Sequence, residues 1–172
     1  GPDAEGFLIE PEAGLAFAHR RLAIVDLTPP GAQPMASSDG RYVCIYNGEI
    51  YNFQDLREEL RAAGRRFRGA SDTEVFLEGC SEWGPERAIA RLNGMFAIVL
   101  WDTRERTATL ARDHLGIKPL YYSATPERLW FASEMKAFQH CPGWRPEIDT
   151  GALAAYLRHG HVPGPGTIFR NV

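Results

Sequence analysis

The sequence predicts an α+β domain in which mostly antiparallel strands are layered against helices. Strand-like segments in the second half of the chain, residues 95–101, 107–112, 120–123 and 129–132, are separated by short turn sequences. Strands joined by such short turns pair antiparallel. Helical patterns are grouped between blocks of strands instead of alternating with single strands, which favours α+β layers over repeated βαβ units.

Composition excludes several classes of protein. A length of 172 residues suits one soluble domain, and the net charge of −3 offers no basic surface for nucleic acid or anionic membranes. The longest apolar run, residues 95–101, is too short to span a bilayer. Cys44, Cys80 and Cys141 are far apart and form no CxxC pair, so we expect no disulfide framework, no metal site and a cytoplasmic location.

The first third of the chain is predicted to contain two strands. The first eighteen residues, punctuated by glycine and proline, are expected to be irregular. Residues 19–27 are rich in β-formers and stop before a Pro-Pro-Gly sequence. A second strand is expected over residues 42–46, after the turn sequence Asp39-Gly40.

Helix signals follow. Asn52 can cap a helix that presents Phe53, Leu56 and Leu60 on one face, and residues 71–74, Ser-Asp-Thr-Glu, match a capping box. Pro85 suits the first turn of a third helix.

The remaining elements lie in the second half of the chain. The continuous apolar run 95–101 predicts a strand that is buried on both faces. Thr150 can cap a short last helix, and the Val-Pro-Gly-Pro-Gly sequence at 162–166 is typical of a linker.

Three positions suggest chemistry. The Asn47 amide and the Gly48 N–H can converge on one oxygen, as an oxyanion hole requires, although an Asn-Gly pair alone is more often an ordinary turn. Arg21, in an apolar strand, can grip a carboxylate with two hydrogen bonds, or form a structural ion pair. Asp72, at a helix start, can receive an amine or simply cap the helix. Together these residues describe a pocket for an α-amino acid.

A nucleophile is missing from this set. Cys44 alternates with Tyr42 and Tyr46 in a predicted strand, so we expect a small buried hydrophobic residue there. His19 and His114 are expected to be hydrogen-bonded structural residues, because no Cys-His or Ser-His arrangement is readable.

Seven sequence motifs cover nearly the whole chain: residues 19–26 (HxRLxIxD), 31–35 (GxQPM), 47–52 (NGEIYN), 71–74 (SDTE), 94–102 (GMFAxxxWD), 111–122 (ARDxxGxKPLYY) and 133–137 (SExKA). In this order they resemble the motifs of asparagine-synthetase-type class II glutamine amidotransferases. The resemblance implies an N-terminal-nucleophile hydrolase fold, an αββα sandwich of two antiparallel sheets between helical layers. It also implies an N-terminal cysteine as nucleophile, with its own α-amine as base.

The family's glutamine-site positions carry over onto Arg21, Ile24, Asn47, Gly48, Glu49 and Asp72. Asn47 and Gly48 would form the oxyanion hole, while Ile24 and Glu49 would line the site with their main chain.

The resemblance implies a longer parent protein. The chain begins with Gly-Pro-Asp, like the end of the family's RHRGPD motif, whereas the family opens with Met-Cys-Gly. Residues 1–148 would be the amidotransferase domain without its first strand and helix, and residues 149–172 would lead toward a C-terminal synthetase domain in cis. That domain would bind ATP and Mg²⁺, whereas this domain would need no cofactor. The isolated chain is expected to be inactive.

The function implied is hydrolysis of glutamine to glutamate, supplying ammonia for ATP-dependent amidation of aspartate or a related carboxylate. The alternative is a non-catalytic scaffold domain, as in β-lactam-synthetase-like proteins, and a third is a free-standing glutamine-binding module. The intact set of Arg21, Asn47, Gly48 and Asp72 favours the enzyme, because a scaffold needs no amino-acid pocket. Glutamine and the synthetase domain are the expected partners, and a homodimer stays open.

Overall fold

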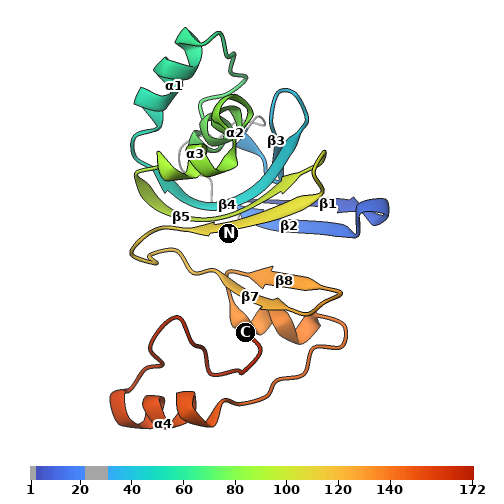
Figure 1. Cartoon of the computed structure of the whole chain (residues 1–172), viewed down its shortest axis with the longest axis vertical. Helices are drawn as coiled ribbons and strands as arrows, with labels where there is room; N and C mark the ends of the chain where they lie inside the picture. Colours follow the sequence, from blue (N-terminus) through green and yellow to red (C-terminus); the bar gives the residue numbers. More distant parts are fainter. Residues whose placement is uncertain (1–2, 22–30) are drawn as a thin grey trace. The chain divides into compact units, whose positions relative to one another are not determined.

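A computed structural model describes residues 3–21 and 31–172 (Figure 1). The chain divides into two compact units, Gly1–Lys118 and Pro119–Val172, and each is described by itself. The expected functional boundary between residues 148 and 149 is a different division and stays a prediction.

The first unit begins with a β-hairpin, so the expectation of an irregular start is wrong. Strand β1 (Ala4–Glu10) pairs antiparallel with β2 (Leu15–Arg21) through the short 3-10 turn η1 (Pro11–Ala13). Gly14 follows this turn at a φ of 67°, a left-handed conformation that glycine adopts without strain. Pro11 and Gly14 therefore shape the turn of the hairpin. Of the strand expected over residues 19–27, the first three residues end β2, and residues 22–30 lie outside the described part.

The main sheet of this unit has four antiparallel strands. Their order in space is β3 (Met35–Ala36), β4 (Tyr42–Ile50), β5 (Gly94–Asp102) and β6 (Thr107–Arg112). Strand β4 runs four residues beyond the predicted end at residue 46 and therefore contains Asn47, Gly48 and Glu49. The predicted burial of β5 on both faces is confirmed, since residues 96–102 are all buried.

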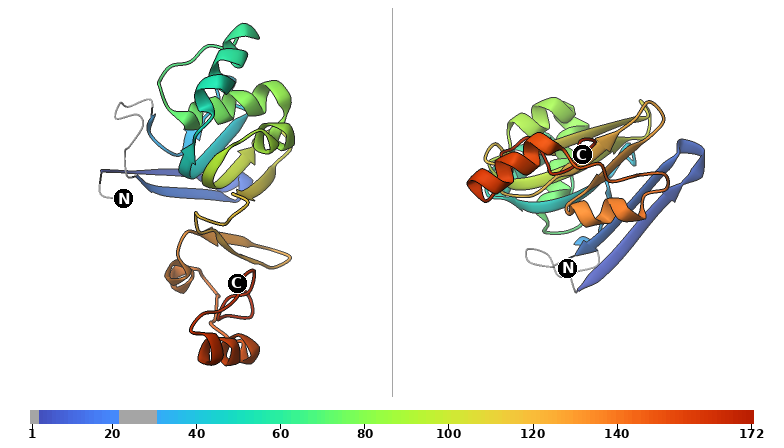
Figure 2. Two further views of the ribbon diagram at one scale, coloured as in Figure 1. Left: turned by 90° about the vertical axis from the view of Figure 1, so that its left-hand side faces the viewer. Right: turned by 90° about the horizontal axis from the view of Figure 1, so that it is seen from below.

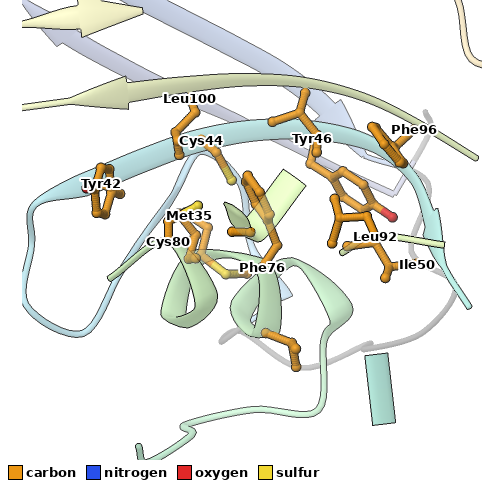
Figure 3. Packing of buried hydrophobic residues seen from close by; sticks show 14 of the residues in the cluster. Met35, Tyr42, Cys44, Tyr46, Ile50, Phe76, Cys80, Leu92, Phe96 and Leu100 are labelled. Atoms are coloured by element: carbon orange, nitrogen blue, oxygen red, sulfur yellow. The ribbon is translucent and has the colours of Figure 1, made fainter. Parts of the chain in front are cut away.

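Three helices lie on one side of this sheet, α1 (Phe53–Ala62), α2 (Asp72–Trp83) and α3 (Pro85–Ala90), with α2 packed against β4 and the other two packed against α2. Alternate residues of β4 and β5 pack against them in one apolar core (Figure 3). The sheet contributes Tyr42, Cys44, Tyr46, Phe96, Ile98 and Leu100, and the helices contribute Leu56, Leu60, Val75, Phe76, Leu77 and Cys80.

The opposite face of the sheet is covered by the β1–β2 hairpin (Figures 1 and 2). Val43 and Val99 point away from the helices yet are only 8% and 3% exposed. Phe17 of β2 is 1% exposed, and the His19 Nε2–H of the same strand donates to Tyr46 O at 3.0 Å. The unit thus stacks helices, sheet and hairpin in layers, and the predicted α+β class with antiparallel sheets is confirmed.

Helix starts follow the predicted pattern with different capping atoms. Ser71 Oγ accepts from Glu74 N at 3.2 Å, as in a capping box, but the Glu74 carboxylate bonds the preceding loop at Arg68 N and Gly69 N. Asn52 stands at the cap position of α1 without capping it, because its side chain bonds Arg91 O and Asn93 N.

The second unit is small. It contains the hairpin β7 (Tyr121–Ala124) and β8 (Leu129–Ala132), the 3-10 helix η3 (Met135–His140) and the helix α4 (Thr150–His159). Asp149 caps α4 by accepting from Ala152 N at 2.8 Å, so the expected cap at Thr150 is one residue late. Among the described residues, no helix has both the length and the apolar character needed to cross a membrane.

Candidate active site

Strand β4 has an open edge next to the Asn47-Gly48 pair. In an antiparallel ladder, successive residues direct their N–H groups to opposite sides. On the β5 side, the Arg41 carbonyl accepts from Thr103 N and Tyr51 N donates to Asn93 O. On the β3 side, Tyr42 N donates to Ser37 Oγ. The backbone N–H groups of the even-numbered residues of β4 therefore point toward the β3 side. Strand β3 itself pairs only with Val43 and Cys44. Beyond that point no described strand pairs with this edge.

Three N–H groups lie along this edge, and side chains cap the outer two. Tyr46 N donates to Gln33 Oε1 at 2.6 Å, and Ile50 N donates to Asp72 Oδ2 at 3.0 Å. The N–H of Gly48 lies between them, and within residues 3–21 and 31–172 no acceptor takes it. Among the described residues, the edge thus leaves one backbone donor available, as an oxyanion hole requires.

Glycine is required at position 48 by the ladder itself. A Cβ there would lie 2.1 Å from Met95 O and 2.7 Å from Phe96 Cα on the neighbouring strand. Gly48 sits opposite Phe96 in a non-hydrogen-bonded pair, where antiparallel strands approach most closely. The interpretation of Asn47-Gly48 as an ordinary turn is therefore wrong, since both residues are within β4.

Asn47 and Glu49 lie on the other side of the strand from the helices. Asn47 is exposed and pairs with Ala97, while Glu49 is half-buried and pairs with Met95. Because side chains alternate along a strand, both are on the face that the hairpin covers, whereas the Tyr46 ring enters the helix-side core.

Asp72 is buried at the first turn of α2, only 4% exposed. Its Oδ2 accepts from the Tyr46 hydroxyl at 2.7 Å and from Ile50 N, and its Oδ1 accepts from Thr73 N at 2.9 Å. A carboxylate offers about four acceptor sites, so one on Oδ1 remains. Ser71 is the helix cap, so the interpretation of Asp72 as the cap is wrong. The helix N-terminus stabilises the Asp72 charge.

Arg21 ends β2, half-buried and opposite Ala4. It lies two residues after His19 and so shares the hairpin face that packs toward the main sheet. Since a carbonyl only accepts, the bond to Tyr46 O requires the His19 proton on Nε2. Burial lowers the pKa of His19, the hydrogen bond to Tyr46 partly opposes this, and the charge of Arg21 lowers it further.

The expected structural role of His19 is thus confirmed. His114 differs: it is exposed, and in the described part of the chain its ring has no hydrogen bond. Ile24 lies outside the described residues.

Two residues of this site were not predicted from the sequence. Gln33 and Tyr46 hold the strand edge, and both look unremarkable in the sequence. A signal existed, because Gln33 belongs to the GxQPM motif and Tyr46 directly precedes NGEIYN.

The described cysteines are poor sources of a thiolate. Cys44 and Cys80 are 0% and 1% exposed, and burial raises the pKa of both thiols. Burial also raises the pKa of Cys141. The predicted role of Cys44 as a buried core residue is confirmed.

The 172-residue chain by itself is therefore expected to release no glutamate from glutamine, because a thiol held protonated is a poor nucleophile. A coupled glutamate assay on the purified chain checks this, with Cys44→Ala as the matched variant. Glutamate release that disappears in Cys44→Ala would contradict it.

Comparison with known proteins connects this geometry to a family. Residues 1–172 match the model of a glutamine amidotransferase domain. The glutamine-hydrolysing asparagine synthetase 1 of Bacillus subtilis is 41% identical over 172 residues, which are 100% of this chain and 26% of that protein. A glutamine-hydrolysing asparagine synthetase 2 of rice is 44% identical over 138 residues, covering 80% of this chain and 22% of that protein.

Solved structures agree on the fold. The glutamine phosphoribosylpyrophosphate amidotransferase of B. subtilis, complexed with ADP and GMP, matches with a TM-score of 0.61 and 25% identity. The match covers 72% of this chain and 28% of that one. An allosteric regulatory enzyme of purine biosynthesis matches with a TM-score of 0.58 at 23% identity, which shows the fold alone. The expected N-terminal-nucleophile hydrolase fold is thus confirmed.

Proposed function

Because the chain belongs to the glutamine amidotransferase domain family, we propose that it binds glutamine for hydrolysis within an asparagine-synthetase-like enzyme. The chain spans about a quarter of the length of the B. subtilis relative. The observation that carries the proposal is the Gly48 N–H on the edge of β4, which no described residue accepts and which lies between two capped neighbours, one of them capped by Asp72.

Each site residue has a role in this proposal. Arg21 holds the carboxylate of glutamine, and Asp72 accepts from its ammonium through the remaining site on Oδ1. The Asn47 amide and Gly48 N–H receive the oxygen of the side-chain amide as negative charge develops on it. Glu49 and Ile24 line the site with their main chain, and the role of Ile24 rests on the family resemblance.

The nucleophile is an N-terminal cysteine of the longer parent protein. Its thiolate attacks the amide carbon of glutamine, and its α-amine takes the thiol proton and passes it to the leaving ammonia. Water then hydrolyses the resulting thioester to glutamate. The role of this chain is to orient glutamine and to stabilise the oxyanion in both steps.

The ammonia passes to a C-terminal synthetase domain, where ATP and Mg²⁺ activate aspartate or a related carboxylate for amidation. The fraction of the relatives that this chain matches leaves room for such a domain. Three free cysteines suit a reducing cytoplasm. A homodimer of the parent is compatible with this arrangement.

A non-catalytic scaffold is not favoured. The similar curated proteins are named as glutamine-hydrolysing asparagine synthetases, and a scaffold gives no reason for keeping an uncapped Gly48 N–H beside a buried Asp72.

The test is amidation of aspartate by the parent protein with two nitrogen sources. We expect asparagine from glutamine and from ammonia, with one glutamate released for each glutamine used. Replacing the N-terminal cysteine with alanine should abolish only the glutamine-dependent reaction. A parent that forms product from ammonia alone, and never releases glutamate, would show that this domain is a scaffold.

A further inference from the structure

Tyr46 uses all three of its polar groups to join different elements. Its N–H donates to Gln33 Oε1, in the segment before β3, and its carbonyl accepts from His19 on β2. Its hydroxyl donates to Asp72 Oδ2 at the start of α2. Tyr46 therefore connects the elements that carry Arg21, Asn47, Gly48 and Asp72.

The Tyr46 hydroxyl is buried and points at the Asp72 carboxylate. Tyr46 is 5% exposed, and its ring lies in the helix-side core near Ile50 (Figure 3). The Tyr46 hydroxyl and Ile50 N approach Asp72 Oδ2 at 2.7 and 3.0 Å, which uses both acceptor sites of that oxygen. Oδ1 is then the oxygen with an acceptor site to spare, since Thr73 N takes only one.

We propose that Tyr46 is a positioning residue for recognition of the α-ammonium group of glutamine, acting by fixing the orientation of the Asp72 carboxylate. The inference rests on the proposed function and adds a residue to it. Without the hydroxyl, Asp72 loses one of three hydrogen bonds and keeps Ile50 N on Oδ2 and Thr73 N on Oδ1, so its carboxylate is held less firmly and its spare acceptor site is less well oriented.

The chain offers a matched control. Tyr42 lies four residues earlier on the same face of β4, is 2% exposed and belongs to the same core. Its hydroxyl forms no hydrogen bond to any residue that the structure describes. Tyr42→Phe therefore removes a tyrosine hydroxyl from the same strand face and the same core without touching Asp72.

The experiment compares Tyr46→Phe and Tyr42→Phe in the parent protein. For Tyr46→Phe we expect KM for glutamine to rise roughly 10- to 150-fold, as for loss of a hydrogen bond to a charged group, with kcat little changed. For glutaramate, which is glutamine without its α-ammonium group, the inhibition constant should stay the same. Tyr42→Phe should change neither quantity.

Each other outcome overturns the proposal. Equal weakening for glutamine and glutaramate means that Tyr46 supports the pocket only as scaffold. A Tyr46→Phe protein that does not fold, while Tyr42→Phe folds, also makes the hydroxyl structural. A wild-type parent that never hydrolyses glutamine contradicts the proposed function instead, so the two failures are distinguishable.

Discussion

Replacing Arg21 with alanine in the parent protein is expected to lower kcat/KM for glutamine by roughly 30- to 1000-fold, the loss of a charge-assisted bidentate pair worth about 2–4 kcal/mol. Arg21 ends β2 on the hairpin face that packs toward the main sheet, and its backbone is held by pairing with Ala4. Synthesis from added ammonia should survive, because ammonia does not use the amino-acid pocket. Both activities and the melting temperature of the variant are measured together.

Arg21→Lys is the informative control for this prediction. It keeps the charge but cannot reproduce the planar fork of the guanidinium, so glutamine use should recover only in part. A structural role predicts another pattern, in which alanine lowers the melting temperature and weakens glutamine and ammonia use alike. Equal loss with both nitrogen sources would leave Arg21 as a brace of β2 and remove it from the pocket.

Local sequence patterns predicted much of the fold. The apolar run of β5 and the turn-bounded strands β6 and β8 were recognisable because buried strands need apolar residues and turns need particular residue types, and both patterns are visible within a few residues of sequence. The starts of α1, α2 and α3 were recognisable from their first residues for the same reason.

The errors arose where tertiary pairing decides the structure. Glycine and proline near the start suggested an irregular chain, yet they shape the turn between β1 and β2 and, at Gly6, a close approach to Gln33 O. Asn47-Gly48 resembled a turn, yet the ladder with β5 continues through both residues. Local propensity cannot show which strands will pair.

In the candidate site, too, some features were predictable from the sequence and others were not. The chemistry of single residues suggested Arg21, Asn47, Gly48 and Asp72, and the motif resemblance supported the same four. The bonds of Tyr46 were not predictable, because its partners Gln33, Asp72 and His19 are 13, 26 and 27 residues away in sequence. Such long-range hydrogen bonds depend on how layers stack, which no local pattern encodes.

Gly48→Ala is expected to destabilise the first unit by about 3 kcal/mol or more, because an added methyl group would overlap backbone that cannot move aside. The new Cβ would lie 2.1 Å from Met95 O, inside the central pair of strands. Urea unfolding of the 172-residue chain measures the loss. Gly166→Ala is the neutral control, because its Cβ would meet only Pro163 O, at an ordinary 3.5 Å.

Gly48→Ala also tests whether glycine is needed at position 48 for strand pairing alone or for the oxyanion hole as well. Gly94→Ala creates a similar overlap two residue pairs along the ladder, 2.2 Å from Glu49 O, without touching the Gly48 N–H. Both variants should lose comparable stability, but in the parent protein only Gly48→Ala should lose about 100-fold or more in kcat for glutamine while ammonia use persists, because the added methyl group displaces the N–H of residue 48 from its place in the oxyanion hole. If Gly94→Ala impairs glutamine hydrolysis to the same degree, then Gly48 is required for strand pairing alone, and its N–H has no part in the chemistry.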